Sequence, residues 1–175
     1  QSLEEHEALA SRGYLVKECT HCGPLYLSEN PWWGRGGMID YTNPAAGLFW
    51  HRFRRHDLVA QGINAHWLDL GEPEQYNVNA WYHGFPERNE HTHRHAHNIY
   101  NWRWIESIAS EYDAANDKRP IILSRSGNAG MQRFGAFMWS GDIGTNATSM
   151  KAHMKAHQHL SLSGIDYYGS DVGGF

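Results

Sequence analysis

The sequence predicts an α/β fold, a (β/α)8 TIM barrel of which this chain is expected to supply a partial segment of about four to five strands with their helices. Short apolar runs alternate with stretches of helical periodicity, and strands that alternate with helices pair in parallel through right-handed crossovers. A charged residue follows each apolar run, as expected where functional groups collect at the carboxyl ends of barrel strands. The length of 175 residues is less than the roughly 200 to 250 residues of a complete barrel. We therefore expect residues 1–175 to form one segment of a larger barrel domain, truncated at both ends.

A helix is predicted close to the start of the chain. Ser2 is a possible N-cap with Glu5 three residues later, which is the pattern of a capping box, and Gly13 is the predicted terminator.

Four apolar runs are predicted as strands of one parallel sheet. With the residues that they lead to, they are Ile63 to Leu70 with Asp69, Ile121 to Ser124 with Arg125, Ala136 to Trp139 with Asp142, and Ile165 to Tyr168 with Asp171.

Helices are predicted between these strands from apolar residues at three- and four-residue spacing. One helix is expected to begin near His97 and Asn98 and to run to Tyr112, and another covers Ala147 to Leu160. The Gly-rich link from Arg125 to the third strand is too short for a long helix.

The charge balance bears on possible partners. Fifteen Lys and Arg against 19 Asp and Glu give a net charge of -4. The basic run at 51–56 is interpreted as the solvated face of a helix opened by Asn43-Pro44, with Phe49, Trp50 and Phe53 turned inward. Nucleic acid is therefore not an expected partner, and no apolar stretch is long enough to predict a membrane span.

Asp69 and Asp142 form the predicted catalytic pair. Breaking a glycosidic bond needs one carboxylate that attacks or stabilises the sugar and one carboxyl that moves a proton. Trp67 and Trp139 lie beside these acids in the sequence and could stack on sugar rings, although packing in the core is an equally good interpretation.

Two other patterns suggest metal, and we interpret both differently. Cys19 and Cys22 have the CxxC spacing of a zinc knuckle or a redox pair, but no second ligand pair follows at zinc-ribbon spacing, so a polar turn is expected. The alternating histidines at 91–97 are expected to form a loop that leads into a helix. No metal and no cofactor is predicted.

Several segments match a known family. In chain order they are Trp-Leu-Asp-Leu-Gly-Glu-Pro at 67–73, Leu-Ser-Arg-Ser-Gly at 123–127, Trp-Ser-Gly-Asp at 139–142 and Gly-Ser-Asp-Val-Gly-Gly-Phe at 169–175, supported by 38–44 and by His-Asn-Ile-Tyr at 97–100. Together they resemble glycoside hydrolase family 31, the family of α-glucosidases, α-xylosidases and sulfoquinovosidases. The resemblance covers nearly the whole chain from about Arg12 and implies the central part of the family's catalytic barrel.

The resemblance implies a role for each matching residue. Asp69 corresponds to the nucleophile and Asp142 to the general acid/base. The residues implied to bind substrate are Arg125, Trp67, Trp139 and Asp171. Gly71 stands where several members of the family have Asn.

Three further carboxylates are interpreted as structural. Asp40 is expected to serve a turn or a cap, and Glu72 and Glu74 are expected to hold the loop after the first predicted strand by hydrogen bonds.

The implied reaction is hydrolysis of α-glycosidic bonds with retention, through a covalent glycosyl-aspartyl intermediate. The expected partners are an α-linked oligosaccharide or α-glycoside substrate and the remainder of the catalytic domain. α-Transglycosylase, α-xylosidase and sulfoquinovosidase activities remain alternatives on the same scaffold. A non-catalytic metal- or carbohydrate-binding module is the alternative of another class.

Overall fold

The computed structural model describes residues 3–30, 34–115 and 118–175. Helix α1 (Leu3–Ala10) ends three residues before Gly13, as predicted. The expected cap at Ser2 lies outside the described residues.

The centre of the fold is a four-stranded, all-parallel sheet in the order β3-β6-β7-β8. Its strands are β3 (Ala65–Leu68), β6 (Ile121–Ser124), β7 (Ala136–Trp139) and β8 (Tyr168–Gly169). Strands β6 and β7 have the predicted bounds, and β3 is shorter than predicted at both ends. The predicted fourth strand, Ile165 to Tyr168, starts too early, since β8 begins only at Tyr168. The Ile165 N–H instead donates to the Leu160 carbonyl oxygen at 2.9 Å, in the turn that follows the preceding helix.

The helices that connect the strands were mostly predicted. Helix α2 (Pro44–Trp50) continues through a π-helical turn, η1 (His51–Arg55), into α3 (His56–Ala60). Its predicted cap is confirmed, since Asn43 Oδ1 accepts a hydrogen bond from Ala45 N at 3.0 Å. Helix α5 (Ala147–Leu162) covers the predicted range, and only a short 3-10 helix, η3 (Met131–Phe134), lies in the Gly-rich link.

The long helix α4 (His93–Ala115) begins earlier than predicted. The expectation of a loop up to His97 is wrong because His93 is buried and its Nδ1 lies 3.0 Å from the Tyr82 hydroxyl. Ala96 and Tyr100 then continue the buried face at helical spacing. The first turn of α4 is therefore stabilised by the packing of His93, a polar residue whose burial the sequence pattern does not indicate.

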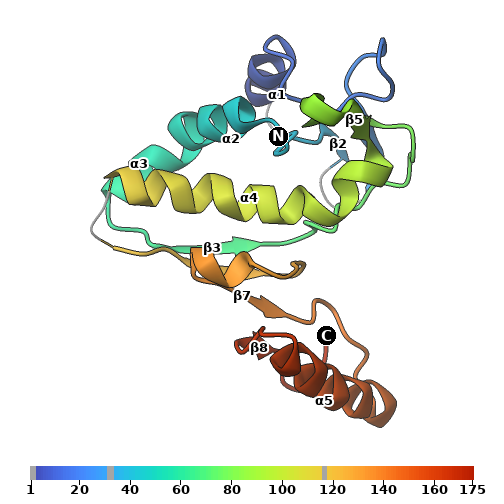
Figure 1. Cartoon of the computed structure of the whole chain (residues 1–175), viewed down its shortest axis with the longest axis vertical. Coiled ribbons are helices and arrows are strands. Elements are labelled where there is room, and N and C mark those ends of the chain that lie inside the picture. Colours follow the sequence, from blue (N-terminus) through green and yellow to red (C-terminus); the bar gives the residue numbers. More distant parts are fainter. Residues whose placement is uncertain (1–2, 31–33, 116–117) are drawn as a thin grey trace.

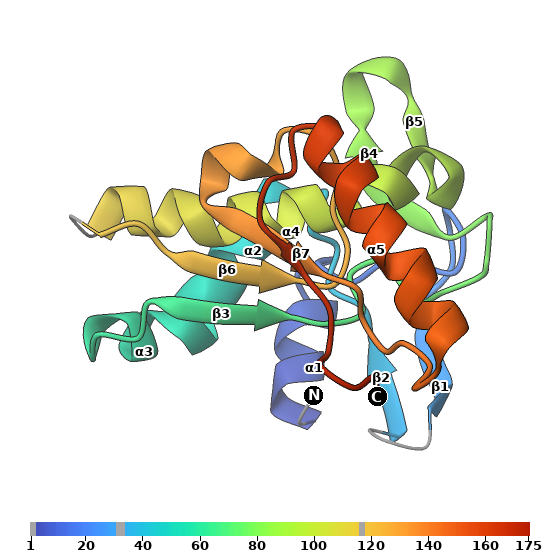
Figure 2. The same cartoon turned by 90° about the horizontal axis from the view of Figure 1, so that it is seen from below.

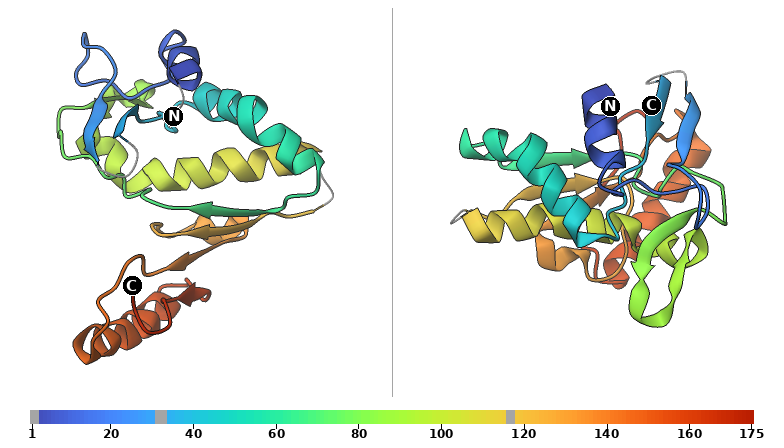
Figure 3. Two further views of the ribbon diagram at one scale, coloured as in Figure 1. Left: turned by 180° about the vertical axis from the view of Figure 1, so that it is seen from behind. Right: turned by 90° about the horizontal axis from the view of Figure 1, so that it is seen from above.

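The helices lie unevenly about the sheet. Figure 1 shows α2, α3 and α4 together on one side of β3, with α5 set apart beside β8, and the left view of Figure 3 shows the same arrangement from behind. The core under α4 contains Leu68, Ile105, Ile108, Tyr112 and Ile122, all nearly inaccessible to solvent. Helix α5 contributes no buried residue in the described chain.

Two antiparallel hairpins were not predicted. They pair β1 (Tyr26–Asn30) with β2 (Gly34–Gly37) and β4 (Trp81–Phe85) with β5 (Glu90–Thr92), and a 3-10 helix, η2 (Pro86–Arg88), lies inside the second. Figure 2 shows both hairpins beyond the carboxyl ends of β3 and β6.

Cys19 and Cys22 form a disulfide. The zinc-knuckle interpretation fails because both thiols are consumed, and the expected polar turn is present as a disulfide-closed turn in which Glu18 N donates to the Gly23 carbonyl oxygen at 3.1 Å. Among residues 3–30, 34–115 and 118–175, no three His, Cys, Asp or Glu side chains converge as a metal ion would require. No described helix combines the length and the apolar character needed to cross a membrane.

Candidate active site

The register of the sheet places Asp69 beside Arg125. Leu68 pairs with Ser124 in the β3–β6 ladder, so the next residue of each strand stands at the same level. The Arg125 N–H also donates to the Leu68 carbonyl oxygen at 3.0 Å, which extends the pairing by one step. Both charged side chains therefore leave the sheet at its carboxyl edge.

The other two strands bring Asp142 and Asp171 to the same edge. Trp139 pairs with Gly169 between β7 and β8. Asp142 follows Trp139 by three residues and Asp171 follows Gly169 by two. Parallel pairing thus gathers residues that lie far apart in the sequence.

Arg125 is held by three carboxylates of a single loop. Its Nε and Nη2 donate to the two oxygens of Glu72 at 2.8 and 2.9 Å, and Nη2 also donates to Glu74 Oε1 at 2.9 Å. Its Nη1 forms an ion pair with Asp69 Oδ1 at 3.1 Å. The expectation that Glu72 and Glu74 serve the loop by hydrogen bonding agrees with these contacts. The bidentate pair with Glu72 fixes the plane of the guanidinium group.

Electrostatic interactions keep the pair of Arg125 and Glu72 charged. Burial alone would raise the pKa of Glu72, but the hydrogen bonds from Arg125 and the charges of Arg125 and His97 lower it overall. The pKa of Arg125 is raised, mainly by its hydrogen bond to Glu72 and against the opposing effect of burial. Arg125 therefore stays a cation beside Asp69.

Gly141 allows Arg125 to cross the loop after β7. Its φ is +67°, and a Cβ atom there would lie 2.6 Å from Arg125 Cδ and 2.8 Å from Arg125 Cγ. The residue between Ser140 and Asp142 must therefore lack a side chain for both conformational and steric reasons.

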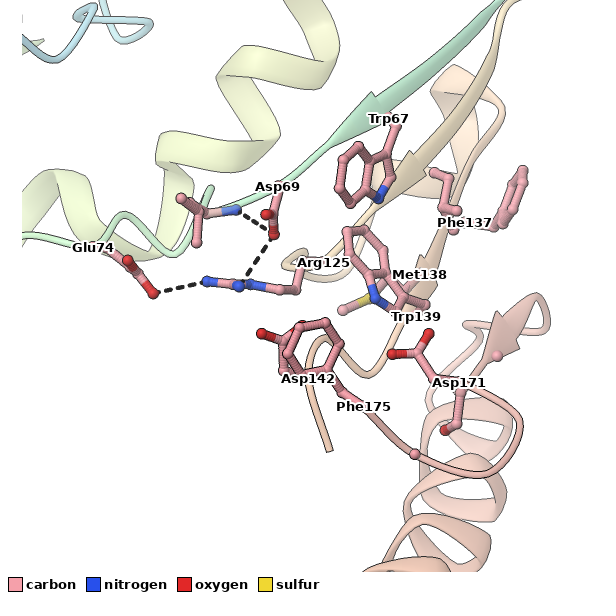
Figure 4. A pocket seen from close by; sticks show the side chains of 15 residues that line it. Trp67, Asp69, Glu74, Arg125, Phe137, Met138, Trp139, Asp142, Asp171 and Phe175 are labelled. Carbon is pink, nitrogen blue, oxygen red and sulfur yellow. Dashed lines mark hydrogen bonds and ion pairs between the residues drawn. The ribbon is translucent and has the colours of Figure 1, made fainter. Parts of the chain in front are cut away.

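The six residues predicted for the site, Asp69, Asp142, Arg125, Trp67, Trp139 and Asp171, all line one open cavity of about 940 Å³. Figure 4 shows Asp69, Asp142 and Asp171 around it, with the Arg125 guanidinium between Asp69 and Asp142 in this view. The structure thus brings together every residue that the sequence predicts for the site.

The two tryptophans form part of the wall. Their ring centroids are 5.7 Å apart with an interplanar angle of 37°. Trp67 is 66% exposed whereas Trp139 is buried. The exposed face of Trp67 is available to a ring from solvent, as sugar-stacking aromatic residues require.

Other described residues line the cavity that were not predicted as site residues, among them Glu74 and Phe175. Glu74 accepts a hydrogen bond from Arg125 Nη2, and Figure 4 shows Phe175 beside Asp142. Glu74 directly follows the segment 67–73, and Phe175 ends the segment 169–175, so both lay at or next to segments that the sequence analysis singled out.

Asp40 is structural, as expected. It is buried, and its Oδ1 accepts hydrogen bonds from Thr42 N and Thr42 Oγ1 while Oδ2 accepts one from His83 N. Burial raises its pKa against these hydrogen bonds. It ties the segment before α2 to β4.

Comparison with known proteins identifies the fold. A family model described as the glycosyl hydrolases family 31 TIM-barrel domain matches residues 1–175. The chain is 32% identical over 165 residues to alpha-glucosidase 2 of Bacillus thermoamyloliquefaciens. The aligned region covers 87% of this chain and 20% of that protein. It is also 32% identical to neutral alpha-glucosidase AB of Sus scrofa, in an alignment that covers 99% of this chain and 19% of that protein. The chain therefore spans about a fifth of the length of these relatives.

Solved structures agree with this match. A GH31 alpha-xylosidase from a soil metagenome, complexed with xylose, superposes with a TM-score of 0.83 at 27% identity, covering 98% of this chain and 24% of that chain. A GH31 dextranase of Flavobacterium johnsoniae, complexed with glucose, gives a TM-score of 0.84 at 24% identity over 98% of this chain and 22% of its own; this likeness concerns the fold alone.

Proposed function

This chain belongs to glycosyl hydrolase family 31, and from this membership and the cavity geometry we propose that it carries the catalytic pair of a retaining α-glycoside hydrolase. The observation that carries the proposal is the meeting of Asp69 and Asp142 at one cavity, with Arg125 paired to Asp69 at 3.1 Å. We further propose that residues 1–175 are one segment of a (β/α)8 catalytic domain, whose remaining strands close the cavity.

The proposed reaction begins with attack by Asp69. Its carboxylate oxygen bonds to the anomeric carbon while the bond from that carbon to the leaving oxygen breaks, and Asp142 gives its proton to that oxygen. The ion pair between Arg125 Nη1 and Asp69 Oδ1, at 3.1 Å, orients the carboxylate that attacks. A glycosyl ester on Asp69 results.

The second step reverses the roles. Asp142, now a carboxylate, takes a proton from water, and the water oxygen bonds to the anomeric carbon as the ester bond to Asp69 breaks. Two displacements at the same carbon leave the sugar with its original anomeric configuration. A second sugar in place of water gives transglycosylation instead.

The proposed substrate is an α-glucoside. The two curated relatives reported above are α-glucosidases of 32% identity. The α-xylosidase of 27% identity supports α-xylosides as the second candidate. Aryl α-glucoside and aryl α-xyloside, offered in parallel to the complete enzyme that contains this chain, separate the two.

The roles of the two acids are tested by substitution and azide rescue in that complete enzyme. Asp69→Ala should abolish turnover of every substrate, because no group remains to form the ester. Asp142→Ala should spare an activated aryl glycoside, whose leaving group needs no proton, and added azide should then accelerate release and give a glycosyl azide of retained configuration. The product configuration is read by NMR.

The control is Asp57→Ala, which removes an exposed carboxylate of α3 and should leave turnover unchanged. Retained azide product from Asp69→Ala, with inverted product from Asp142→Ala, would mean that the two roles are reversed. Full activity of both variants would refute the proposed function.

A further inference from the structure

Asn101, on the face of α4 that meets the sheet, binds the loop that begins with Arg125. The residue is buried, with 4% of its surface exposed. Its Nδ2 donates to Ser124 Oγ at 2.8 Å and to the Ser126 carbonyl oxygen, and Ser124 Oγ donates to that same carbonyl at 2.8 Å. The two residues that flank Arg125 in the chain are thus fixed to α4 through one side-chain amide.

The same amide touches the loop that begins with Asp69. A Cβ atom built on Gly71 would lie 2.8 Å from Asn101 Cγ, closer still to Asn101 Oδ1, and 3.1 Å from Ser126 Oγ. The φ of Gly71 is not positive, so its backbone accepts any L residue and the need for glycine is one of space. Asn101 therefore lies in the volume that a side chain at position 71 would occupy.

This contact bears on Asp69 through a tight turn. Leu70, between Asp69 and Gly71, has a φ of +60°, and its N–H donates to Asp69 Oδ1 at 3.0 Å. A non-glycine residue with positive φ persists where its surroundings impose it. Packing of Gly71 against Asn101 is one such restraint, and it lies two residues from the carboxylate.

The polarity of Asn101 is unusual for a residue that only fills space. In the described part of the chain its Oδ1 has no hydrogen-bond partner, and neither has Ser126 Oγ. Burying unpaired polar atoms is unfavourable, so a residue that served packing alone would be better apolar. The donor side of the amide, which holds the loop of Arg125, accounts for its presence.

We propose that Asn101 is a positioning residue that sets the spacing between the loop of Asp69 and the loop of Arg125, with Gly71 as its steric complement. The inference rests on the proposed function, since it concerns the geometry of the Asp69–Arg125 pair. Asn101 acts only through these loops and touches no substrate.

The test uses the complete enzyme and an activated aryl α-glycoside. Asn101→Ala removes the three-way link and should lower kcat by roughly 10- to 100-fold, the loss expected from misplacing a reacting group by about 1 Å, with little change in KM. Gly71→Asn should also lose kcat because its side chain collides with Asn101. The double variant Gly71→Asn/Asn101→Gly returns an amide to the same volume from the opposite side and should recover most of the lost kcat.

Ile108→Val is the matched control for stability. Ile108 is buried in the core on the same helix, within the cluster that contains Leu68 and Ile122. Its truncation should lower the thermal midpoint without lowering kcat when the assay is run well below that midpoint. A kcat loss in Asn101→Ala that exceeds that of Ile108→Val at an equal fall in midpoint supports a positioning role.

The outcomes separate this proposal from the proposed function. Wild-type kcat in Asn101→Ala, or a double variant no better than Gly71→Asn alone, overturns the positioning role while an active wild type leaves the proposed function standing. A wild-type enzyme inactive on aryl α-glucoside and aryl α-xyloside overturns both.

Discussion

Arg125 contacts two loops that border the cavity, the loop after β3 and the loop after β7. Three carboxylates from the loop after β3, Asp69, Glu72 and Glu74, bind its guanidinium group. The aliphatic part of the same side chain lies over Gly141 of the loop after β7. A single side chain therefore links the segment of the proposed nucleophile to the segment of the proposed acid/base.

Gly141→Ala tests this link at the residue scale. The new methyl group would lie 2.6 Å from Arg125 Cδ, and the alanine would have to adopt a φ of +67°. Arg125 is therefore expected to move away from Asp69. We expect kcat/KM of the complete enzyme to fall by about 100-fold or more, measured on an aryl α-glycoside.

Gly23→Ala provides the control for this prediction. A Cβ there meets no atom within 4 Å, and no positive φ applies, so activity should stay unchanged. Normal activity of Gly141→Ala would show that Arg125 can move without loss and would remove it from the proposed mechanism.

At the scale of elements, the sequence predicted what local pattern controls. Strands β6 and β7 were predicted to the residue because their apolar runs are short and end at Arg125 and at Ser140-Gly141. The start of α4 was missed because the burial of His93 depends on tertiary contacts such as that with Tyr82 on β4. The hairpins were missed because their short strands carry glycines and histidines and depend on tertiary pairing.

In the candidate site, too, the features that follow from local pattern were predicted and those that depend on tertiary contacts were not. Asp69, Arg125 and Asp142 stand next to recognisable strand ends, so their gathering follows from parallel topology. The contact of Asn101 with Gly71 depends on how closely α4 approaches the loop after β3, and no local pattern encodes that approach.

The contact between β3 and α4 should respond to pH. His66 on β3 lies 2.8 Å through its Nε2 from the Tyr112 hydroxyl on α4, and burial, with the charge of Arg55, lowers its pKa to about 4. The folded state therefore binds fewer protons than the unfolded state between about pH 4 and the ordinary value of about 6.5. The stability present above this window is lost as the pH falls through it.

The thermal midpoint of the complete enzyme should accordingly fall as the pH is lowered from about 7.5 to about 5. The variant His66→Gln should show a smaller fall. Burial also lowers the pKa of His51 to about 4. His51 should therefore preserve part of the pH dependence of the thermal midpoint in this variant. His21→Gln, on the exposed disulfide-closed turn, is the control and should leave the slope unchanged. An identical slope in wild type and His66→Gln would contradict the assignment.

At the scale of the whole molecule, the sheet has one covered face and one open face. On β3 and β6, Leu68 and Ile122 are buried in the cluster that α4 covers, whereas Trp67 and Leu123 line the cavity. Trp67 and Ile121 are 66% and 49% exposed. Parallel sheets in proteins are normally covered on both faces, and in a closed barrel the inner face is filled by side chains from the other strands.

The 175-residue chain alone should therefore bind a hydrophobic dye and show little or no turnover. Among the described residues, no strand pairs with the outer edges of β3 and β8, and the cavity face stays open. Adding the rest of the catalytic domain as a second polypeptide should displace the dye and restore turnover, because we expect the added strands to cover Ile121 and to close the cavity that Trp67 lines. Trp67→Ser serves as the control in the dye assay: it should reduce dye binding by the isolated chain before any complementation, because it removes the most exposed aromatic side chain of the sheet face. A dye-free, cooperatively unfolding monomer with the turnover of the complete enzyme would show that this segment is self-sufficient and that the open face needs no partner.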